Sequence, residues 1–214
     1  MLFAGIDMKI LEHFPSRRHS VYKVKLRLRN NIMPAVLKIF KGEKAASLCQ
    51  AECENLLKLS DRGIRVPRVL ERDEKALLME YLEGVPVSSL AQSLDMGSWI
   101  EETACWLVQL HGEKIGSKSL LKGDANLRNF IFFGGKTFGI DFEEMDCGDF
   151  RQDLAEVCFF LLTDDPSLTP EKDQMVRRFL KTYEKHAGIS IEDMDKFILE
   201  SRSRARIRRK CFRK

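Results

Sequence analysis

The stretch LLKGDANLRNFIFFGGKTFGIDFEEMD, residues 120–146, decides the fold of this 214-residue chain. Asp124 precedes Asn129 by five positions, and Asp141 follows twelve positions later. Between Asn129 and Asp141 lie an apolar run, a pair of glycines and a second strand-like run, which is a pattern typical of a β-hairpin. A hairpin brings its two ends together, so we expect Asp124, Asn129 and Asp141 to converge at one edge.

Such a set of side chains suits phosphoryl transfer from a nucleotide. An amide oxygen and a carboxylate, here Asn129 and Asp141, can hold Mg²⁺ against phosphate oxygens. A separate carboxylate, Asp124, can orient the accepting hydroxyl and take its proton. The order D-x-x-x-x-N, hairpin and I-D-F is the catalytic-loop and metal-loop arrangement of kinases.

The chain before this stretch is rich in strand patterns, and the chain after it is mostly helical. Strand composition or alternation is found in residues 8–14, 20–28, 34–40, 68–72 and 76–82. Helical spacing or helix-boundary residues predict helices over 44–60, 98–112, 150–164 and 170–187, and a last one from about 190. The one clear shift in composition lies near residues 84–86.

We therefore expect an α+β, two-lobed protein-kinase-like fold. The N-lobe, residues 1–83, would be an antiparallel β-sheet with one helix, and the mainly helical C-lobe, residues 84–201, would carry the catalytic hairpin. Residues 202–214 form a basic tail with eight Arg or Lys, so the net charge of +4 is concentrated there. The tail favours an RNA or ribonucleoprotein partner; the alternative is a solvated helix end whose cations complement the helix dipole.

The quoted stretch resembles the H-G-D-x-x-x-x-N…I-D-[FW] block of the atypical kinase-like phosphotransferases. This superfamily includes the RIO kinases, the small kinase of the KEOPS tRNA-modification complex, and the aminoglycoside and choline kinases. The resemblance implies ATP and Mg²⁺ as cofactors, Asp124 as the catalytic residue, and Asn129 and Asp141 as metal ligands. It covers about residues 10–165, with its motifs in the expected order.

Four further segments carry the resemblance. AVLKIF resembles the lysine strand, which places Lys38 on the α- and β-phosphates, and AECENLLKLSDRGIRVPRVL resembles the segment whose acid, Glu52 and not Glu54, holds that lysine. ALLMEYLEG resembles the hinge strand, which implies adenine binding by the backbone of Glu80 and Leu82.

The fourth segment, GDFRQDLA, resembles the G-D-x-x-x-D-L-A element, in which Asp153 would brace the catalytic loop. His111, near a helix end, is interpreted as a partner of the helix dipole and nothing more.

Two departures from the family pattern concern phosphate. The segment FPSRRHSVYKV, residues 14–24, lacks the glycine of the corresponding RIO loop. Because close approach of backbone to phosphate normally uses glycine, this loop would bind phosphate through Arg17, Arg18 and the Ser20 hydroxyl, or the nucleotide site is altered. Lys122 replaces the usual His or Arg; it would pair with an acidic group such as Glu143 or reach a substrate phosphate.

Segment lengths bear on the acceptor. Only 39 residues separate Gly84 from Asp124, and 73 follow Asp141, whereas the aminoglycoside and choline kinases carry a larger helical insertion. We therefore favour a small RIO-like or KEOPS-like serine/threonine protein kinase or ATPase. The alternatives are a small-molecule kinase and a non-catalytic nucleotide-sensing, RNA-associated module.

Apolar runs, the N-terminal residues and the cysteines bear on the cellular compartment of the protein. No apolar run approaches the roughly 20 residues of a membrane span, and the N-terminal residues lack the pattern of a signal peptide. The six cysteines contain no CxxC pair, which indicates reduced thiols rather than a zinc site. We expect a cytoplasmic protein.

Overall fold

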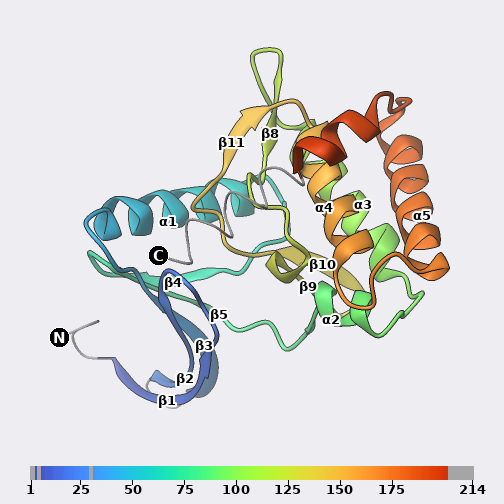
Figure 1. The fold of residues 1–214 in the computed structure, drawn as a ribbon. Coiled ribbons are helices and arrows are strands. Elements are labelled where there is room, and N and C mark those ends of the chain that lie inside the picture. Colours follow the sequence, from blue (N-terminus) through green and yellow to red (C-terminus); the bar gives the residue numbers. More distant parts are fainter. Residues whose placement is uncertain (1–2, 4–5, 29–30, 202–214) are drawn as a thin grey trace. The chain divides into compact units, whose positions relative to one another are not determined.

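The computed structural model describes residues 3, 6–28 and 31–201 (Figure 1). It divides into two compact units. The N-terminal unit comprises residues 1–83 and 141–143, and the C-terminal unit comprises residues 84–140 and 144–214. The basic tail lies outside the described residues, so its proposed role stays a prediction.

The N-terminal unit is built on a five-stranded antiparallel sheet with the strand order β1-β2-β3-β5-β4 (Figure 1). The strands are β1 (Asp7–Phe14), β2 (Ser20–Leu28), β3 (Asn31–Ile39), β4 (Val69–Arg72) and β5 (Ala76–Glu80). Alternation along the central strands buries Val24, Ala35, Leu37 and Leu78 in one apolar cluster. Lys38, which neighbours Leu37, therefore faces the opposite side of the sheet.

Among the described residues of this unit there is one helix, α1 (Ala45–Asp61), which packs against β4 and β5. Cys49, Cys53, Leu56 and Leu59 recur at helical spacing and form its buried face. Glu52 lies on the same face and is buried with them. This face therefore carries a carboxylate into the interior of the N-terminal unit.

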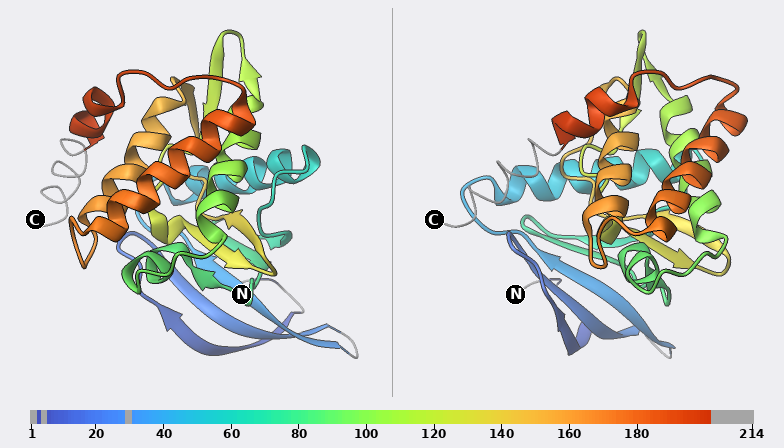
Figure 2. Two further views of the ribbon diagram at one scale, coloured as in Figure 1. Left: turned by 90° about the vertical axis from the view of Figure 1, so that its right-hand side faces the viewer. Right: turned by 45° about the vertical axis from the view of Figure 1, so that its right-hand side comes forward.

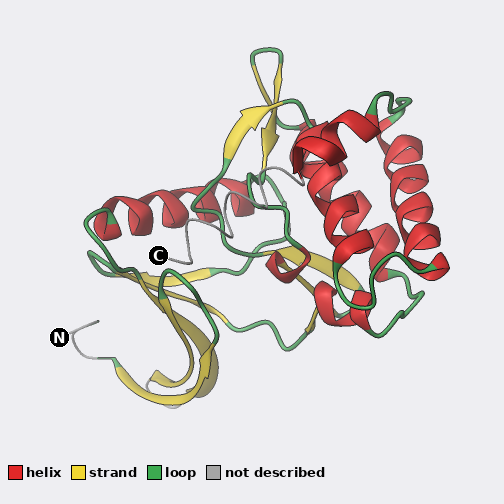
Figure 3. Ribbon diagram, viewed as in Figure 1, coloured by secondary structure: helices red, strands yellow, loops and turns green. Residues whose placement is uncertain are grey.

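The C-terminal unit is mainly helical (Figure 3). Its helices are α2 (Val87–Gln92), α3 (Trp99–Gly112), α4 (Arg151–Thr163) and α5 (Pro170–Ala187), a 3₁₀ turn η1 (Leu127–Asn129) and a helical segment at 194–201. Helix α5 packs against both α3 and α4 (Figure 2). The side chain of Thr169 accepts a hydrogen bond from the Lys172 N–H at its start, and Gly188 ends it with φ of 67°, as the sequence predicts.

Two small sheets complete this unit. One has the order β10-β9-β6 and the other β11-β8-β7. The strands are β6 (Val85–Pro86), β7 (Lys114–Ile115), β8 (Lys118–Leu121), β9 (Phe130–Phe133), β10 (Lys136–Gly139) and β11 (Asp146–Gly148). Strands β9 and β10 are the predicted hairpin, and Phe130 packs edge-on against Trp106 of α3 with ring centroids 5.4 Å apart.

The expected α+β fold, with an antiparallel sheet carrying one helix and a mainly helical part carrying the hairpin, is confirmed. The sequence did not predict β6, β7, β8, β11 or α2. These elements are two to six residues long, and such short segments form because of tertiary pairing rather than local preference. No helix among the described residues combines the length and hydropathy that crossing a membrane requires.

Candidate functional site

Lys38 lies at the centre of a carboxylate cluster in the N-terminal unit. Its Nζ donates to Glu52 Oε2 at 2.5 Å and to Asp141 Oδ1 at 2.9 Å, and Glu143 Oε2 lies 3.9 Å away. The residue is only 5% exposed. Burial alone would lower the pKa of Lys38, but the three carboxylates outweigh burial and raise the pKa above its usual value. The ammonium is therefore charged at neutral pH.

Glu52 reaches this cluster from the buried face of α1 and is 1% exposed. Glu54, two positions further along, is exposed and accepts a hydrogen bond from Gln50 Nε2 at 2.8 Å. The helical period accounts for the difference, because only position 52 lies on the same face as Cys49 and Leu56. The structure thus brings Glu52, and not Glu54, to Lys38.

Asp141 adopts a left-handed backbone conformation with φ of 63°. Asp tolerates this region better than most residues, yet such positions still cost on the order of 1–3 kcal/mol and gather at functional sites. Asp141 directly follows Ile140, whose N–H donates to the carbonyl of Asn129 at 2.9 Å. This hydrogen bond closes the hairpin at the residue directly before Asp141.

Glu143 is held by two residues of the glycine-free loop. Arg18 Nη1 lies 3.1 Å from its Oε1, and His19 Nε2 lies 2.6 Å from its Oε2. His19 Nδ1 accepts the N–H of Lys41 at 3.3 Å, so the ring proton lies on Nε2 and is donated to Glu143. Burial would raise the pKa of Glu143, but the His19 hydrogen bond and the Lys38 charge outweigh burial and lower that pKa.

The three predicted phosphate ligands of this loop are placed differently from one another. Arg18 is engaged with Glu143, Arg17 is exposed, and Ser20 is buried at the start of β2. His19 was missed by the sequence analysis. The available signal was the replacement of the usual glycine by consecutive polar side chains, but its partner lies 124 positions away.

The hinge segment begins at Glu80, the last residue of β5. The Glu80 N–H donates to the Arg68 carbonyl at 2.9 Å, so the backbone group of Glu80 that could serve adenine is its carbonyl. Leu82 is buried. Between them, the Tyr81 ring has Lys23 Nζ 3.9 Å from its centroid. The predicted adenine contacts thus lie on a segment anchored to the sheet.

In the C-terminal unit, Asp124 and Asn129 contact each other directly. Asn129 Nδ2 donates to both the carbonyl and Oδ2 of Asp124, each at 3.1 Å. Because its amide nitrogen is used in this way, Oδ1 is the Asn129 atom that could bind a cation. The 3₁₀ turn η1 brings this side chain back to Asp124.

Asp153 of α4 braces the loop that carries Asp124. Its Oδ2 accepts the Lys122 N–H at 2.6 Å, and its Oδ1 accepts the Gly123 N–H at 3.2 Å. The interpretation of His111 as a dipole partner alone is wrong. His111 is buried, contacting Asp153 Oδ2 at 3.1 Å and the Tyr183 hydroxyl at 2.9 Å. These partners lie on α4 and α5, so the sequence of α3 does not specify them.

Lys122 is fully buried in the C-terminal unit, with its Nζ 5.8 Å from the centroid of the Phe130 ring. Its ammonium is therefore not presented to solvent. A further residue that the sequence did not indicate is Glu156 of α4, whose Oε2 accepts the Ala125 N–H at 3.0 Å. The signal was a glutamate within an otherwise apolar run.

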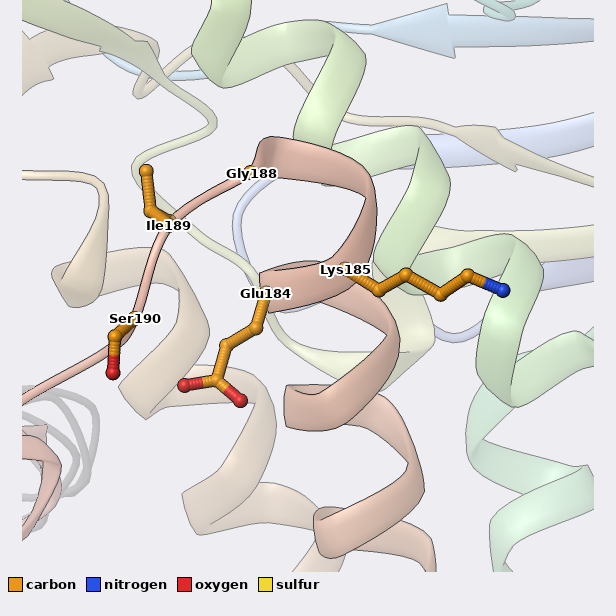
Figure 4. A pocket seen from close by; sticks show the side chains of 5 residues that line it. All are labelled: Glu184, Lys185, Gly188, Ile189 and Ser190. Atoms are coloured by element: carbon orange, nitrogen blue, oxygen red, sulfur yellow. The ribbon is translucent and has the colours of Figure 1, made fainter.

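An open hollow of about 510 Å³ lies at the end of α5, lined by Glu184, Lys185, Gly188, Ile189 and Ser190 (Figure 4). The side chains of Glu184 and Lys185 point to different sides (Figure 4). Glu184 Oε1 accepts the Ile191 N–H at 2.8 Å, so this carboxylate stabilises the helix end. None of the predicted site residues lines the hollow.

The fold is that of kinase-like phosphotransferases. Aminoglycoside phosphotransferase APH(2'')-Ib, bound to ADP, matches with a TM-score of 0.65 at 15% identity, covering 91% of this chain and 81% of that chain. APH(3'')-Id from Streptomyces rimosus matches with a TM-score of 0.67 at 15% identity, covering 89% of this chain and 90% of that chain. Macrolide 2'-phosphotransferase MphH from Brachybacterium faecium matches with a TM-score of 0.69 at 13% identity, covering 94% of this chain and 86% of that chain. At these identities the likeness establishes the fold alone.

The family is established by the sequence. The model of the RIO domain matches residues 22–147, more than half of the chain. The chain therefore belongs to the RIO domain family, and the expected membership of the kinase-like superfamily is confirmed. A search of curated proteins found no match.

Proposed function

We propose that this protein transfers a phosphoryl group from ATP to a hydroxyl acceptor with Mg²⁺. The observation that carries the proposal is the contact of the buried Lys38 with the buried Glu52 and the partly exposed Asp141. Buried ion pairs seldom stabilise a fold better than apolar side chains of similar volume, because desolvation offsets their attraction. The Lys38–Glu52 pair, joined by a third charged group, Asp141, therefore supports a functional role.

Lys38 would bind the phosphates of the nucleotide, and Glu52 would hold the ammonium in place. The charge of Lys38 is maintained by the surrounding carboxylates, which raise its pKa. Arg18, with its side chain 41% exposed, is the member of the glycine-free loop that could exchange its Glu143 contact for a phosphate oxygen. Adenine would be recognised by the backbone of Glu80 and Leu82.

Asp141 and Asn129 offer the hard oxygen atoms that Mg²⁺ prefers. The donor set fits the metal, since the Asn129 nitrogen is committed to Asp124 and its oxygen is the remaining ligand atom. When bound, Mg²⁺ would neutralise phosphate charge. Asp124 would accept the proton of the hydroxyl acceptor, with its orientation fixed by the two hydrogen bonds from Asn129.

For the acceptor we favour a serine or threonine hydroxyl of a protein, or water, because the family model is that of the RIO domain. A small-molecule hydroxyl is the second candidate. It is supported by the likeness to aminoglycoside and macrolide phosphotransferases, of which the chain covers 81–90%, so segment length does not separate the two. A non-catalytic nucleotide-sensing module would not need a carboxylate at position 124, and the presence of Asp124 there therefore favours a catalytic role.

The cysteines support our placement of the protein in the cytoplasm. Those of the described residues, Cys49, Cys53, Cys105, Cys147 and Cys158, form no disulfide bond, as expected of a reducing compartment. Burial raises the pKa of Cys49 to about 11, which keeps this thiol unreactive.

Transfer of radiolabelled γ-phosphate tests the proposed function. The protein is incubated with Mg-ATP alone, and with protein, tRNA or aminoglycoside acceptors, beside its Asp124→Asn variant. We expect label in inorganic phosphate or in one acceptor class, and loss of that label in the variant. Absence of label from every fraction, or equal labelling by the variant, would contradict the proposal.

A further inference from the structure

Helix α4 carries two buried carboxylates one turn apart. Asp153 is 2% exposed and Glu156 is 7% exposed, and residues three apart on a helix share a face. Their neighbours Leu154, Ala155 and Val157 are buried apolar residues. A charged side chain in such surroundings is expensive unless it is hydrogen-bonded.

Both carboxylates accept backbone N–H groups from one short loop. Asp153 holds the N–H groups of Lys122 and Gly123 at 2.6 and 3.2 Å. Glu156 holds the N–H of Ala125 at 3.0 Å. Asp124 is the residue between Gly123 and Ala125. The Ala125 N–H belongs to the peptide group that follows Asp124, and the Lys122 and Gly123 N–H groups belong to the two peptide groups that end at Gly123. Two side chains of the same helix therefore hold the backbone on both sides of Asp124.

Gly123 makes this arrangement possible. Its φ is 81°, and a Cβ atom there would approach the Glu144 carbonyl oxygen to 1.9 Å. Only glycine fits this backbone without strain. The loop thus has little room to move at Gly123. On the other side of Asp124, Asn129 Nδ2 donates to the Asp124 carbonyl and Oδ2, and Glu156 accepts the N–H of the same peptide group, so Glu156 adds a second constraint on the orientation of Asp124.

We propose that Glu156 is a positioning residue for Asp124. The proposal rests on the proposed function, in which Asp124 accepts the proton of the hydroxyl. Asp153 lies in the G-D-x-x-x-D-L-A element, whereas Glu156 lies outside it. Misplacement of a catalytic group by about 1 Å can lower a rate roughly 100-fold, so losing the Glu156 contact should affect turnover more than nucleotide affinity.

Amide hydrogen exchange tests the contact without any activity. We compare the nucleotide-free wild type with Glu156→Ala, Glu156→Gln and a matched control, Glu184→Ala, whose carboxylate also accepts a backbone N–H, that of Ile191. The Ala125 amide should exchange at least about tenfold faster in Glu156→Ala, and stay protected in Glu156→Gln and in Glu184→Ala. Unchanged exchange in Glu156→Ala would overturn the proposal, whether or not the protein binds ATP.

Hydrolysis of Mg-ATP, with water as the acceptor, tests the consequence. Glu156→Ala should lower kcat about 10- to 100-fold while the Kd for Mg-ATP stays within twofold, and Glu156→Gln should recover most of kcat because its amide oxygen still accepts the N–H. Glu156→Asp, which retains the charge but is one methylene shorter, covers the case in which Glu156→Ala does not fold, and should also lower kcat. Wild-type kcat in the folded Glu156→Ala or Glu156→Asp protein would overturn the proposal. Failure of the wild type to bind ATP would instead contradict the proposed function. The exchange result would then still show whether Glu156 holds the Ala125 N–H.

Discussion

Replacing Lys38 with methionine removes the ammonium that compensates the buried carboxylate of Glu52. Leaving one member of a buried ion pair without its partner costs about 3–5 kcal/mol. The reverse change, Glu52→Gln, is milder, because Lys38 retains Asp141 at 2.9 Å and Glu143 at 3.9 Å. It removes one charged hydrogen bond, worth about 1.5–3 kcal/mol. We therefore expect Lys38→Met to destabilise the protein more than Glu52→Gln.

The double variant distinguishes this electrostatic account from a packing effect. With both charges removed, the cost of the isolated Glu52 carboxylate disappears, so Lys38→Met/Glu52→Gln should be more stable than Lys38→Met alone. Coupling between contacting residues typically reaches about 0.5–3 kcal/mol. Lys25→Met, the same substitution at an exposed position of β2, is the matched control and should change stability by less than about 0.5 kcal/mol.

The pH dependence follows from the same charges. Burial raises the pKa of Glu52, and the charge and hydrogen bond of Lys38 oppose that rise. In Lys38→Met this opposition is lost, so the pKa of Glu52 rises further. A carboxyl whose pKa is higher in the folded than in the unfolded protein stabilises the fold below its unfolded pKa, and that contribution is lost as pH rises through the folded pKa. The deficit of Lys38→Met relative to wild type should therefore be larger at pH 7 than at pH 5.

Urea denaturation at both pH values, followed by circular dichroism, measures these differences. The reasoning is refuted if Lys38→Met is no less stable than Glu52→Gln at pH 7. It is also refuted if the loss of unfolding free energy in the double variant equals the sum of the losses in the two single variants.

Three further predictions address other parts of the chain. Asp124→Asn should lower turnover by about 10²–10⁴-fold with Mg-ATP affinity retained in calorimetry; an active variant would show that another group takes the proton. Lys172 is fully buried and its Nζ has no hydrogen-bond partner among the described residues, so Lys172→Met should raise stability by about 1–3 kcal/mol. Burial lowers the pKa of Lys172, so the wild type should approach the variant as pH rises toward 10.5, the ordinary lysine value, and a constant difference in thermal melts would contradict this account. Truncation after Ser201 should weaken tRNA binding and flatten its salt dependence between roughly 50 and 200 mM, whereas unchanged RNA binding would remove the proposed role of the tail.

The hairpin and helix α5 could be predicted because their signals are local. A two-glycine turn joins β9 and β10, and Thr169 and Gly188 bound α5 through their own side chain and backbone. Lys38 could be predicted because a lysine within an apolar strand is conspicuous. Each of these inferences depends on residues adjacent in the chain.

The remaining parts of the site depend on partners that are distant in the sequence. His19 and Glu143 are 124 positions apart, and Ala125 and Glu156 are 31 apart. Neither pair has a local pattern, because a hydrogen bond between elements is determined by packing. His111 was misinterpreted for the same reason, since its partners Asp153 and Tyr183 lie on other helices.

Calorimetric titration with ATP, with and without Mg²⁺, tests the central claim most directly. The wild type should bind Mg-ATP, and Asp141→Ala should weaken that binding strongly, because the carboxylate that would hold the metal is gone. Asp146→Ala, which removes an exposed carboxylate five positions further along, should leave the affinity unchanged. Absence of Mg-ATP binding by the wild type, or equal affinity in Asp141→Ala, would contradict the account.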